Sequence, residues 1–304
     1  FGVDFNTLNN RLALTLEGYY EWHREILMPI KASVAGTVGT KSASLNFGEM
    51  DAWGFEVSAT WRDKIGKDFK YKIGLNTGYS DNKMLNMDWE TDQIYMKKRY
   101  GKRTDVGTWG MQCLGMFRSY QDIEEYFAKY NIRTYMGMAK DEVRPGMLIY
   151  KDVRGAYNTE TGQYEGPDGV VDKDNDQVRL SNRSNPWGFT TNLSAEWKGI
   201  SLTAQINANW GGYRVIPTAS LKPGTNIEMT NMPSFWKVED MYSYHNVYDD
   251  NGNLLVAQNL NGSLPNLAHS SVNSYASTFW RVNGTQVRLN RLTLAYAIPS
   301  KFVK

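Results

Sequence analysis

The chain has 304 residues, enough for one large or two ordinary domains. Its 34 basic and 32 acidic residues leave a net charge of +2, which gives no reason to expect nucleic-acid binding through bulk charge. The single cysteine, Cys113, excludes an internal disulfide and a cysteine-based metal site.

No apolar run reaches the about 18 residues that a membrane-spanning helix requires. Strands of a transmembrane β-barrel escape such a search, because their apolar residues alternate with polar ones. The composition therefore leaves both a soluble β-protein and a barrel open.

Alternating apolar residues predict three strands in the first part of the chain, near 9–24, 50–62 and 68–80. In WGFEVSATW, residues 53–61, every odd position is bulky or apolar and Glu56, Ser58 and Thr60 are polar. We expect the second and third strands to form a hairpin through 62–68, with Trp61 opposite Phe69.

A long connection, 25–49, separates the first two of these strands, and a longer one, 81–186, follows the third. The 81–186 segment is too aromatic for disorder. Within it SYQDIEEYFAKYN predicts a helix with Ser119 as N-cap and Lys129 near its end. The apolar stripe of this helix is Ile123, Tyr126, Phe127 and Tyr130, more typical of packing than of ligand contact.

An acidic motif, PDGVVDKDNDQ, lies near the end of this connection. Its acidic side chains are those of Asp168, Asp172, Asp174 and Asp176. The Asp-x-Asp-x-Asp spacing is that of the start of a calcium loop. The sixth position is Gln177 rather than glycine and the twelfth is Arg183 rather than glutamate. A solvated acidic turn is therefore the alternative to a calcium site.

The clearest pattern is WGFTTNLSAEWKGISLTAQINANWGG, residues 187–212. Apolar residues occupy odd positions up to Trp197 and even positions from Ile200 onward. This change of parity predicts strands at 187–198 and 200–211, joined by a tight turn at Lys198-Gly199. Trp197 then faces Ile200 and Trp187 faces Trp210, so that one face of the hairpin is apolar and the other polar.

After another long connection, 212–277, a sixth strand is expected near 278–298. Its apolar parity shifts between Leu289 and Leu292, which predicts a β-bulge near Asn290-Arg291. If the strands alternate in direction, the short turns fall at one end of the sheet and the three long loops at the other.

This asymmetry is typical of outer-membrane barrels, and so are tryptophans at both ends of an apolar face. A soluble β-sandwich would show the same alternation, with the aromatic residues in its core. The sequence favours an all-β fold that is part of a large antiparallel transmembrane barrel. Six strands do not close a barrel, so we expect a segment of a larger one.

Aromatic residues of the long loops are candidate ligand contacts, because flat rings beside amides and charges suit sugars and peptide side chains. These candidates are Trp89, Trp109, Tyr135, Tyr164, Tyr213 and Trp236. Packing within the loops is the alternative for each. No GxSxG, Walker or GxGxxG motif is present, so we expect no enzymatic activity.

Several segments resemble one known family, the SusC/RagA-type TonB-dependent outer-membrane transporters. In chain order they are CLGMFRS with Asp122-Ile123, PGMLIYKDVRG, PDGVVDKDND, SNPWGFTTNLSAEWKGISLTAQ and STFWRVNGTQVRLNRLTLAYAIP. Two departures stand out. An insertion, AYNTETGQYEG, precedes the acidic motif, and Arg154 stands where the family usually has asparagine.

The resemblance implies a C-terminal segment of a 22-stranded barrel, without the plug domain. It also implies nutrient import across the outer membrane of a Bacteroidetes-type bacterium, with oligosaccharide or oligopeptide as cargo. The expected partners are a SusD-like surface lipoprotein, TonB acting through a region outside this chain, and outer-membrane lipid. Calcium is the one cofactor considered. The rival hypotheses are a soluble carbohydrate-binding β-sandwich and a surface adhesin that keeps the barrel but does not transport.

Overall fold

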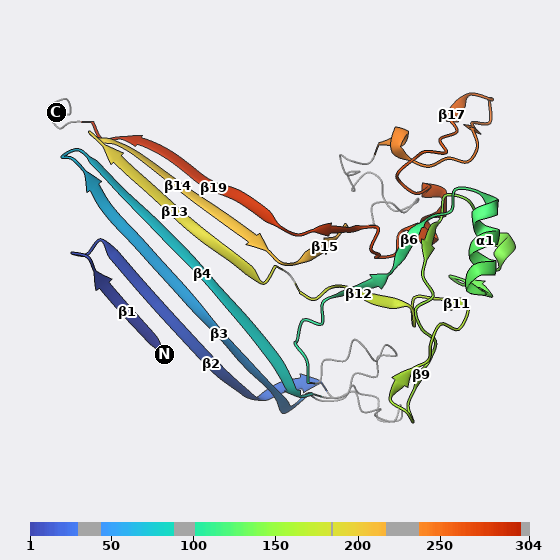
Figure 1. Cartoon of the computed structure of the whole chain (residues 1–304), viewed down its shortest axis with the longest axis horizontal. Helices are drawn as coiled ribbons and strands as arrows, with labels where there is room; N and C mark the ends of the chain where they lie inside the picture. The colour runs from blue at the N-terminus through green and yellow to red at the C-terminus, as the bar shows by residue number, and fades with distance from the viewer. Residues whose placement is uncertain (30–43, 88–100, 184, 217–236, 299–304) are drawn as a thin grey trace.

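The computed structural model describes residues 1–29, 44–87, 101–183, 185–216 and 237–298. These residues form a long antiparallel sheet and a compact unit of connecting segments at one end of it, which we call the loop unit (Figure 1). In the described residues, no helix is both long enough and apolar enough to cross a membrane.

The large sheet has seven strands in the order β1-β2-β3-β4-β13-β14-β19, all antiparallel to their neighbours. Their bounds are β1 Gly2–Thr7, β2 Leu12–Pro29, β3 Ser44–Ile65, β4 Phe69–Asn86, β13 Trp187–Trp197, β14 Ile200–Trp210 and β19 Gln286–Tyr296. The turns after β1, β3 and β13 share one end of the sheet, and the long connections leave from the other (Figure 1). The predicted asymmetry of short turns and long loops is therefore confirmed.

Sequence patterning missed β1 and the full length of β2 and β3. Residues 1–10 contain β1, which pairs with β2 from Gly2 opposite Glu17 to Thr7 opposite Leu12. The strands β2 and β3 extend well past the expected ends at 24 and 50, and their pairing there is irregular between His23 and Leu27. Such irregular pairing breaks the strict alternation on which the prediction relied.

The register expected for the β3–β4 hairpin is wrong by four residues. Trp61 lies opposite Ile73 rather than Phe69, because the strands continue to a tight turn with Ile65 opposite Phe69. Gly66 makes this turn with a φ of 65°. The shift is an even number, so every side chain stays on its expected face.

The β13–β14 hairpin has the predicted register over all eleven pairs, from Trp187 opposite Trp210 to Trp197 opposite Ile200. Lys198 and Gly199 both have positive φ, 48° and 85°, as a type I′ turn requires. The predicted bulge in β19 is confirmed, because the register shifts where Gln205 faces Arg291 and Ile206 faces Leu289.

The loop unit is built from short strands and two α-helices. The strands are β5 Thr108–Met111, β6 Cys113–Met116, β7 Thr134–Tyr135, β8 Leu148–Tyr150, β9 Tyr157–Asn158, β10 Gln163–Tyr164, β11 Val170–Val171, β12 Gln177–Ser181, β15 Tyr213–Val215, β16 Val247–Tyr248, β17 Leu254–Val256 and β18 Arg281–Asn283. The helices are α1 Tyr120–Tyr130 and α2 Ser270–Asn273, with 3-10 turns at Lys140–Glu142, Val238–Asp240 and Leu267–His269. The last predicted strand, 278–298, is thus two strands, β18 and β19.

The helix α1 begins as predicted, because the Ser119 side chain accepts a hydrogen bond from the Asp122 N–H. It ends at Asn131, which has a left-handed φ of 52°. Ile123, Tyr126 and Phe127 are buried, whereas Tyr130 at the edge of the stripe remains 42% exposed.

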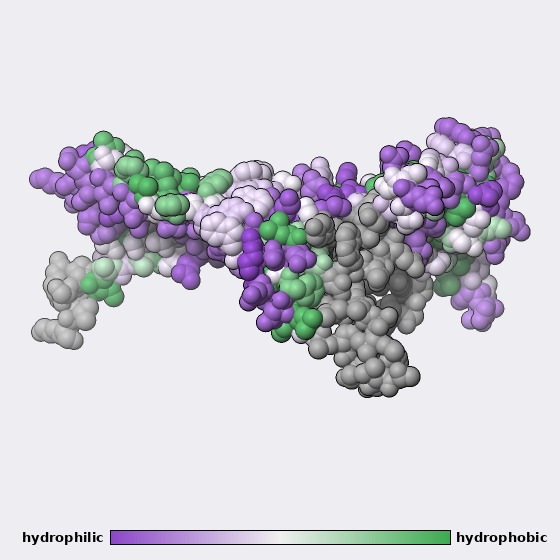
Figure 2. Space-filling view, turned by 90° about the horizontal axis from the view of Figure 1, so that it is seen from below, coloured by the Kyte–Doolittle hydropathy of each residue, from purple (hydrophilic) through white to green (hydrophobic). Residues whose placement is uncertain are grey.

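The hydrophobic core of the described residues lies in the loop unit rather than against the large sheet. Its largest fully buried side chains include those of Phe117, Tyr135, Tyr150, Tyr242 and Trp280. These residues come from segments before and after the β13–β14 hairpin, so the core joins the described residues of these segments into one body. Figure 2 shows hydrophilic residues over much of the outer surface of this body.

Candidate functional site

The large sheet has one face of apolar side chains that no other part of the described structure covers. Its exposed members include Leu16, Ile73, Leu75, Ile200, Leu202, Leu292 and Leu294. The cross-strand pairs Leu202–Ala195 and Leu202–Leu294 place side chains from three neighbouring strands together on this face. An exposed apolar surface of this extent marks a site of contact with protein or membrane.

Aromatic rings border this apolar face at both of its ends. At the loop end the Tyr79 and Trp187 rings lie 4.6 Å apart, and Phe55 stacks on Tyr79 at 6.3 Å. At the turn end lie Trp197 and Phe69, which face each other across β13 and β4. The ten residue steps from Trp187 to Trp197 span about 34 Å along the strand. With a tilt of about 45° this corresponds to about 24 Å, close to the apolar band of an outer-membrane barrel.

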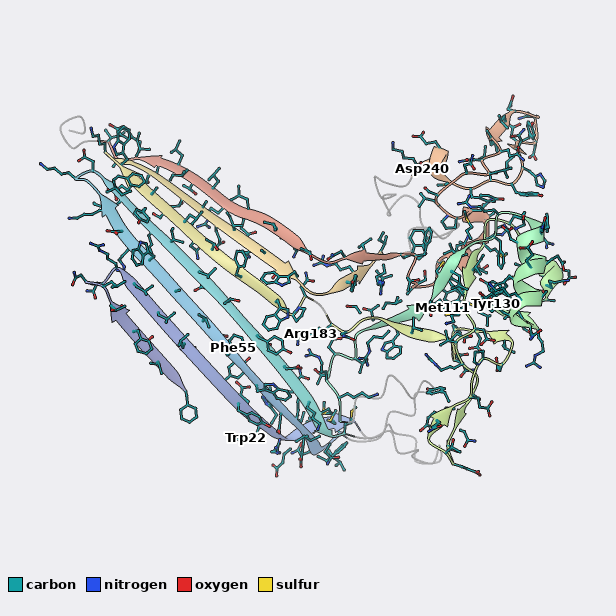
Figure 3. The ribbon with its side chains drawn as sticks, in the orientation of Figure 1. Trp22, Phe55, Met111, Tyr130, Arg183 and Asp240 are labelled. Carbon is teal, nitrogen blue, oxygen red and sulfur yellow. The ribbon has the colours of Figure 1, made fainter. Side chains whose placement is uncertain are left out.

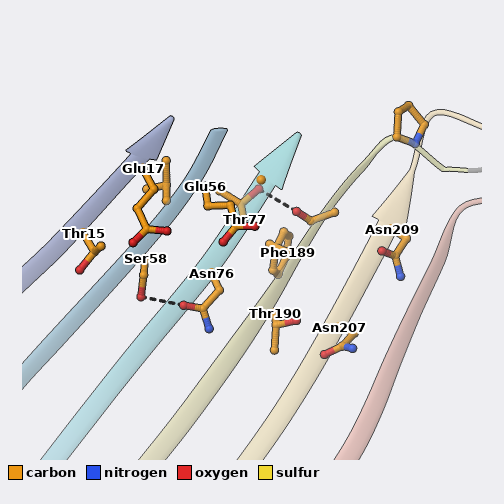
Figure 4. A pocket seen from close by; sticks show the side chains of 14 residues that line it. Thr15, Glu17, Glu56, Ser58, Asn76, Thr77, Phe189, Thr190, Asn207 and Asn209 are labelled. Atoms are coloured by element: carbon orange, nitrogen blue, oxygen red, sulfur yellow. Dashed lines mark hydrogen bonds between the residues drawn. The ribbon is translucent and has the colours of Figure 1, made fainter. Parts of the chain in front are cut away.

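The opposite face is polar and contains a cavity of about 580 Å³ near the middle of the sheet (Figure 4). Ser58 donates a hydrogen bond to Asn76 across β3 and β4, 2.8 Å long. Glu17 and Glu56 lie directly opposite each other along the cavity wall. Hydroxyls, amides and carboxylates on one wet surface can bind polar ligands, but they form no catalytic arrangement.

On the polar face, basic side chains gather at the end of the strands that carries the short turns. Towards the short turns, Arg62 lies opposite Lys72 and Lys64 opposite Lys70, so two like-charge pairs are adjacent. Lys70 also forms an ion pair with Glu196, at 3.7 Å. We call these four residues the basic cluster. The basic cluster could not be found from the sequence alone, because in the register expected for the β3–β4 hairpin these residues do not lie opposite one another.

The predicted aromatic contacts do not form one site. Tyr135 is fully buried, donates from its hydroxyl to the Leu148 carbonyl and stacks on Tyr150, so it is a core residue. Trp109 and Tyr213 flank β12, and Tyr164 lies on the separate β9–β10 hairpin, edge-to-face with Tyr157 at 4.9 Å. Trp89 and Trp236 lie outside the described residues.

An arginine lies over the ring of each of the three remaining aromatic residues. The guanidinium of Arg179 lies 5.0 Å from the Trp109 ring centre, Arg154 lies 5.4 Å from Tyr164 and Arg281 lies 4.5 Å from Tyr213. These cation–π contacts occupy one face of each ring. Their role as cargo contacts stays a prediction.

The acidic motif forms turns in the structure. Asp168 accepts from the Val170 N–H, and Asp172 accepts from the N–H groups of Asp174 and Asn175, which it caps. Asp174 itself is exposed. Within the described ranges, no three acidic, histidine or cysteine side chains have the geometry of a metal site. The calcium site therefore stays a prediction, and the observed hydrogen bonds give these carboxylates a structural role.

Asp176 is the buried member of this motif. Its carboxylate is fully buried and accepts from the N–H groups of Val153, Arg154 and Asp172 at 2.6–3.1 Å. Burial raises its pKa to about 6, although these hydrogen bonds favour the charged form. Burial also raises the pKa of the neighbouring Asp152. The motif thus ties the segment after β8 to the segment before β12.

Comparisons with known proteins agree with the fold. No protein-family model matches the chain. The "TonB-dependent receptor SusC" of Bacteroides thetaiotaomicron is 27% identical over 94 residues, which are 31% of this chain and 9% of that protein. The RagAB peptide importer in its "closed-closed" state matches all of this chain with a TM-score of 0.58 and 16% identity. Its "open-open" state matches 98% with a TM-score of 0.56 and 15% identity.

The chain covers 29% and 27% of the lengths of those two solved chains. The relatives are described as a receptor and as importers, not as enzymes. The all-β class and the antiparallel sheet of this chain are thus those of part of a much longer solved chain. Motifs, relative and fold together confirm the resemblance of this chain to the SusC/RagA-type TonB-dependent transporters.

Proposed function

We propose that this chain is part of an outer-membrane importer that takes up large nutrients, oligosaccharides or oligopeptides. In this proposal the apolar face contacts lipid, the polar face lines the lumen, and the loop unit lies outside the cell. The uncovered apolar face between two rows of aromatic residues carries the proposal, because water disfavours such a surface and a bilayer does not.

The direction of the strands supports one orientation in the membrane. Outer-membrane barrels have short turns on the periplasmic side and long loops outside. The Lys198-Gly199 turn and the basic cluster then lie near the periplasm, and α1 and its core lie at the cell surface, where a SusD-like lipoprotein would contact them. TonB would act through a region outside this chain.

A soluble β-sandwich is the second candidate, and the packing argues against it. A sandwich buries the apolar faces of two sheets against each other. In the described residues the apolar face of the large sheet stays exposed, with Leu202 at 45% and Leu294 at 73%, and the buried core is elsewhere.

Quenching of tryptophan fluorescence by brominated phospholipid tests the membrane placement in the intact protein. Trp197→Phe and Trp210→Phe should each remove a component that the lipid quenches, because these rings are 51% and 40% exposed on the apolar face. Trp280→Phe is the matched control, because Trp280 is 1% exposed inside the loop unit and should remove an unquenched component. If all three substitutions changed the lipid-quenched part of the fluorescence equally, the membrane placement would be refuted.

Measurements of nutrient uptake distinguish an importer from an adhesin. Cells that depend on this protein for an oligopeptide or oligosaccharide should lose growth on that nutrient when TonB is deleted. An adhesin would leave uptake unchanged. Parallel growth on both cargo classes decides between peptide and glycan.

A further inference from the structure

A pocket of positively charged side chains lies where the large sheet meets the loop unit. Its volume is about 550 Å³. Its charged lining residues are Asp81, Lys102, Arg103, Asp105, Arg179 and Arg183. Four of these side chains are cationic and two are acidic, so the lining has a net charge of +2. We call it the arginine pocket.

The arginine pocket lies on the apolar face of the sheet, not on the polar one. Tyr79 packs against Trp187 and Phe55 in the aromatic row at the loop end of that face. Asp81 is two residues further along β4 and lies opposite Trp53, so its side chain has the same parity as Tyr79. The pocket therefore begins directly beyond the aromatic row. Figure 3 shows Arg183 at the loop end of the sheet, beyond Phe55.

The two acids of the pocket are already engaged. Asp81 forms an ion pair with Arg103 through one oxygen, and its other oxygen lies 3.8 Å from Arg183. It also accepts from the Tyr79 hydroxyl at 3.0 Å. Asp105 accepts from the Gly107 N–H at 2.9 Å. One carboxylate thus serves two guanidinium groups, which leaves an excess of positive charge.

Two arginine nitrogens lack the partners that their burial demands. Arg103 Nε and Arg183 Nη1 are buried and have no hydrogen-bond acceptor among the described residues; Arg183 Nη1 has only the longer ion-pair contact of 3.8 Å with Asp81. The two side chains are only 25% and 17% exposed. Buried charged donors without acceptors are costly, so their persistence at one site points to an oxyanion that would accept from them.

Contacts within the protein preorganise the guanidinium groups of the pocket. Arg183 lies 5.1 Å from the Tyr79 ring centre and donates to the Ser80 carbonyl at 2.9 Å. Arg179 lies over Trp109 at 5.0 Å. Planar, oriented guanidinium groups match the oxygens of phosphate better than flexible ammonium groups do.

We propose that the arginine pocket binds the phosphate of an anionic lipid in the outer leaflet, whose acyl chains lie along the apolar face. This inference rests on the proposed membrane placement. Aromatic rows mark the depth of the lipid headgroups, and basic pockets at that depth bind anionic headgroups. A cargo anion would instead be expected on the polar face, which lines the lumen in the proposed function.

The test uses the intact protein in nanodiscs of phosphatidylcholine alone or with phosphatidic acid, which carries a phosphate monoester. Lipids that stay bound are counted by native mass spectrometry, and the dissociation constant is measured by titration. The wild type should retain phosphatidic acid, and Arg103→Gln and Arg183→Gln should each bind it roughly tenfold more weakly. Arg291→Gln is the matched control, because Arg291 lies on the polar face opposite Gln205 and should leave binding unchanged.

Other outcomes separate the alternatives. Binding of inorganic phosphate as tight as that of phosphatidic acid would reject a lipid and indicate a free-anion site. Equal retention of phosphatidic acid by wild type and both arginine variants would overturn the proposal. Arg183→Lys guards against a folding defect, because it keeps the charge and should retain part of the binding. If brominated lipid quenches Trp197 and Trp210 but the pocket fails these tests, only the pocket is refuted and the membrane placement stands.

Discussion

The side-chain oxygen of Asn273 accepts a hydrogen bond from the Leu148 N–H, 2.8 Å long, across 125 residues of sequence. The Asn273 amide group donates to the carbonyls of Gly146 and Asn266 at 2.9 and 2.8 Å. Asn273 is 4% exposed, so one buried side chain joins the two long connections of the loop unit.

Asn273→Leu should therefore destabilise the loop unit by about 3 kcal/mol or more. The change leaves one N–H and two carbonyls buried without partners, and each unsatisfied group costs about 1–3 kcal/mol. Denaturant unfolding followed by near-UV circular dichroism measures the loss. Asn251→Leu, at an exposed turn, is the control and should change stability by less than about 0.5 kcal/mol. Similar losses in the two variants would contradict this role.

Asp176 should make the loop unit less stable as pH rises from about 4 to 6. Its folded pKa, about 6, lies above the ordinary value of about 3.9, so the folded state binds more protons in this interval. Stability from this group is present below pH 4 and is lost as pH rises through 6, on the order of 2 kcal/mol. Asp152, whose pKa burial also raises, contributes with the same sign.

The measurement is the unfolding free energy of the intact protein against pH. Asp176→Asn should show a smaller decline between pH 4 and 6, whatever its absolute stability, because asparagine does not titrate and only the contribution of Asp152 remains. Asp174→Asn, at an exposed position of the same motif, should keep the wild-type profile. A profile that is unchanged in Asp176→Asn would show that Asp176 does not titrate in this range.

The turn at Lys198-Gly199 should respond in opposite directions to two substitutions. Gly199→Ala places a Cβ 3.3 Å from the Ala297 carbonyl at a φ of 85°, and should cost about 1–2 kcal/mol. Lys198→Asn should be neutral or stabilising, because asparagine tolerates the positive φ of 48° better than lysine does. Urea unfolding from vesicles measures both, and destabilisation by Lys198→Asn would argue against the type I′ geometry.

Leu202 and Thr203 are neighbours in β14 on opposite faces of the sheet. If the apolar face contacts lipid, Leu202→Lys should cost about 2–4 kcal/mol and Thr203→Lys less than about 1 kcal/mol, because lysine is costly only in the hydrocarbon. Unfolding from phosphatidylcholine vesicles in urea gives both values. Equal costs would be incompatible with one lipid face and one wet face.

The sheet was predictable where strict alternation meets a short turn. The β13–β14 hairpin has a two-residue turn, so a change of parity determines its register completely. The β3–β4 turn is three residues long, Gly66 to Asp68, and alternation alone does not distinguish registers that differ by an even number. The strand β1 was missed although Phe1, Val3 and Phe5 alternate with Gly2, Asp4 and Asn6, because so short a run does not by itself reveal its pairing with β2.

The loop unit was predictable only in its local parts. The cap at Ser119 and the buried face of α1 depend on neighbours in sequence, and both were predicted. The core depends on contacts such as Tyr150 with Val272, whose hydroxyl–carbonyl hydrogen bond joins residues 122 positions apart. The arginine pocket was hidden for the same reason, although Arg183 did stand out as the wrong residue for a calcium loop.

The basic cluster gives the sheet an unusual response to salt. Most surface charge contacts weaken as ions screen them, but Arg62 opposite Lys72 and Lys64 opposite Lys70 repel each other. Raising the ionic strength from 0.01 to 0.15 M shortens the screening length from about 30 to about 8 Å and relieves this repulsion. At low salt the same four charges project a positive potential from the turn end of the polar face, which attracts anions to that end and repels cations. Ionic strength thus changes both the stability of the hairpin and the strength with which this end of the sheet attracts anions.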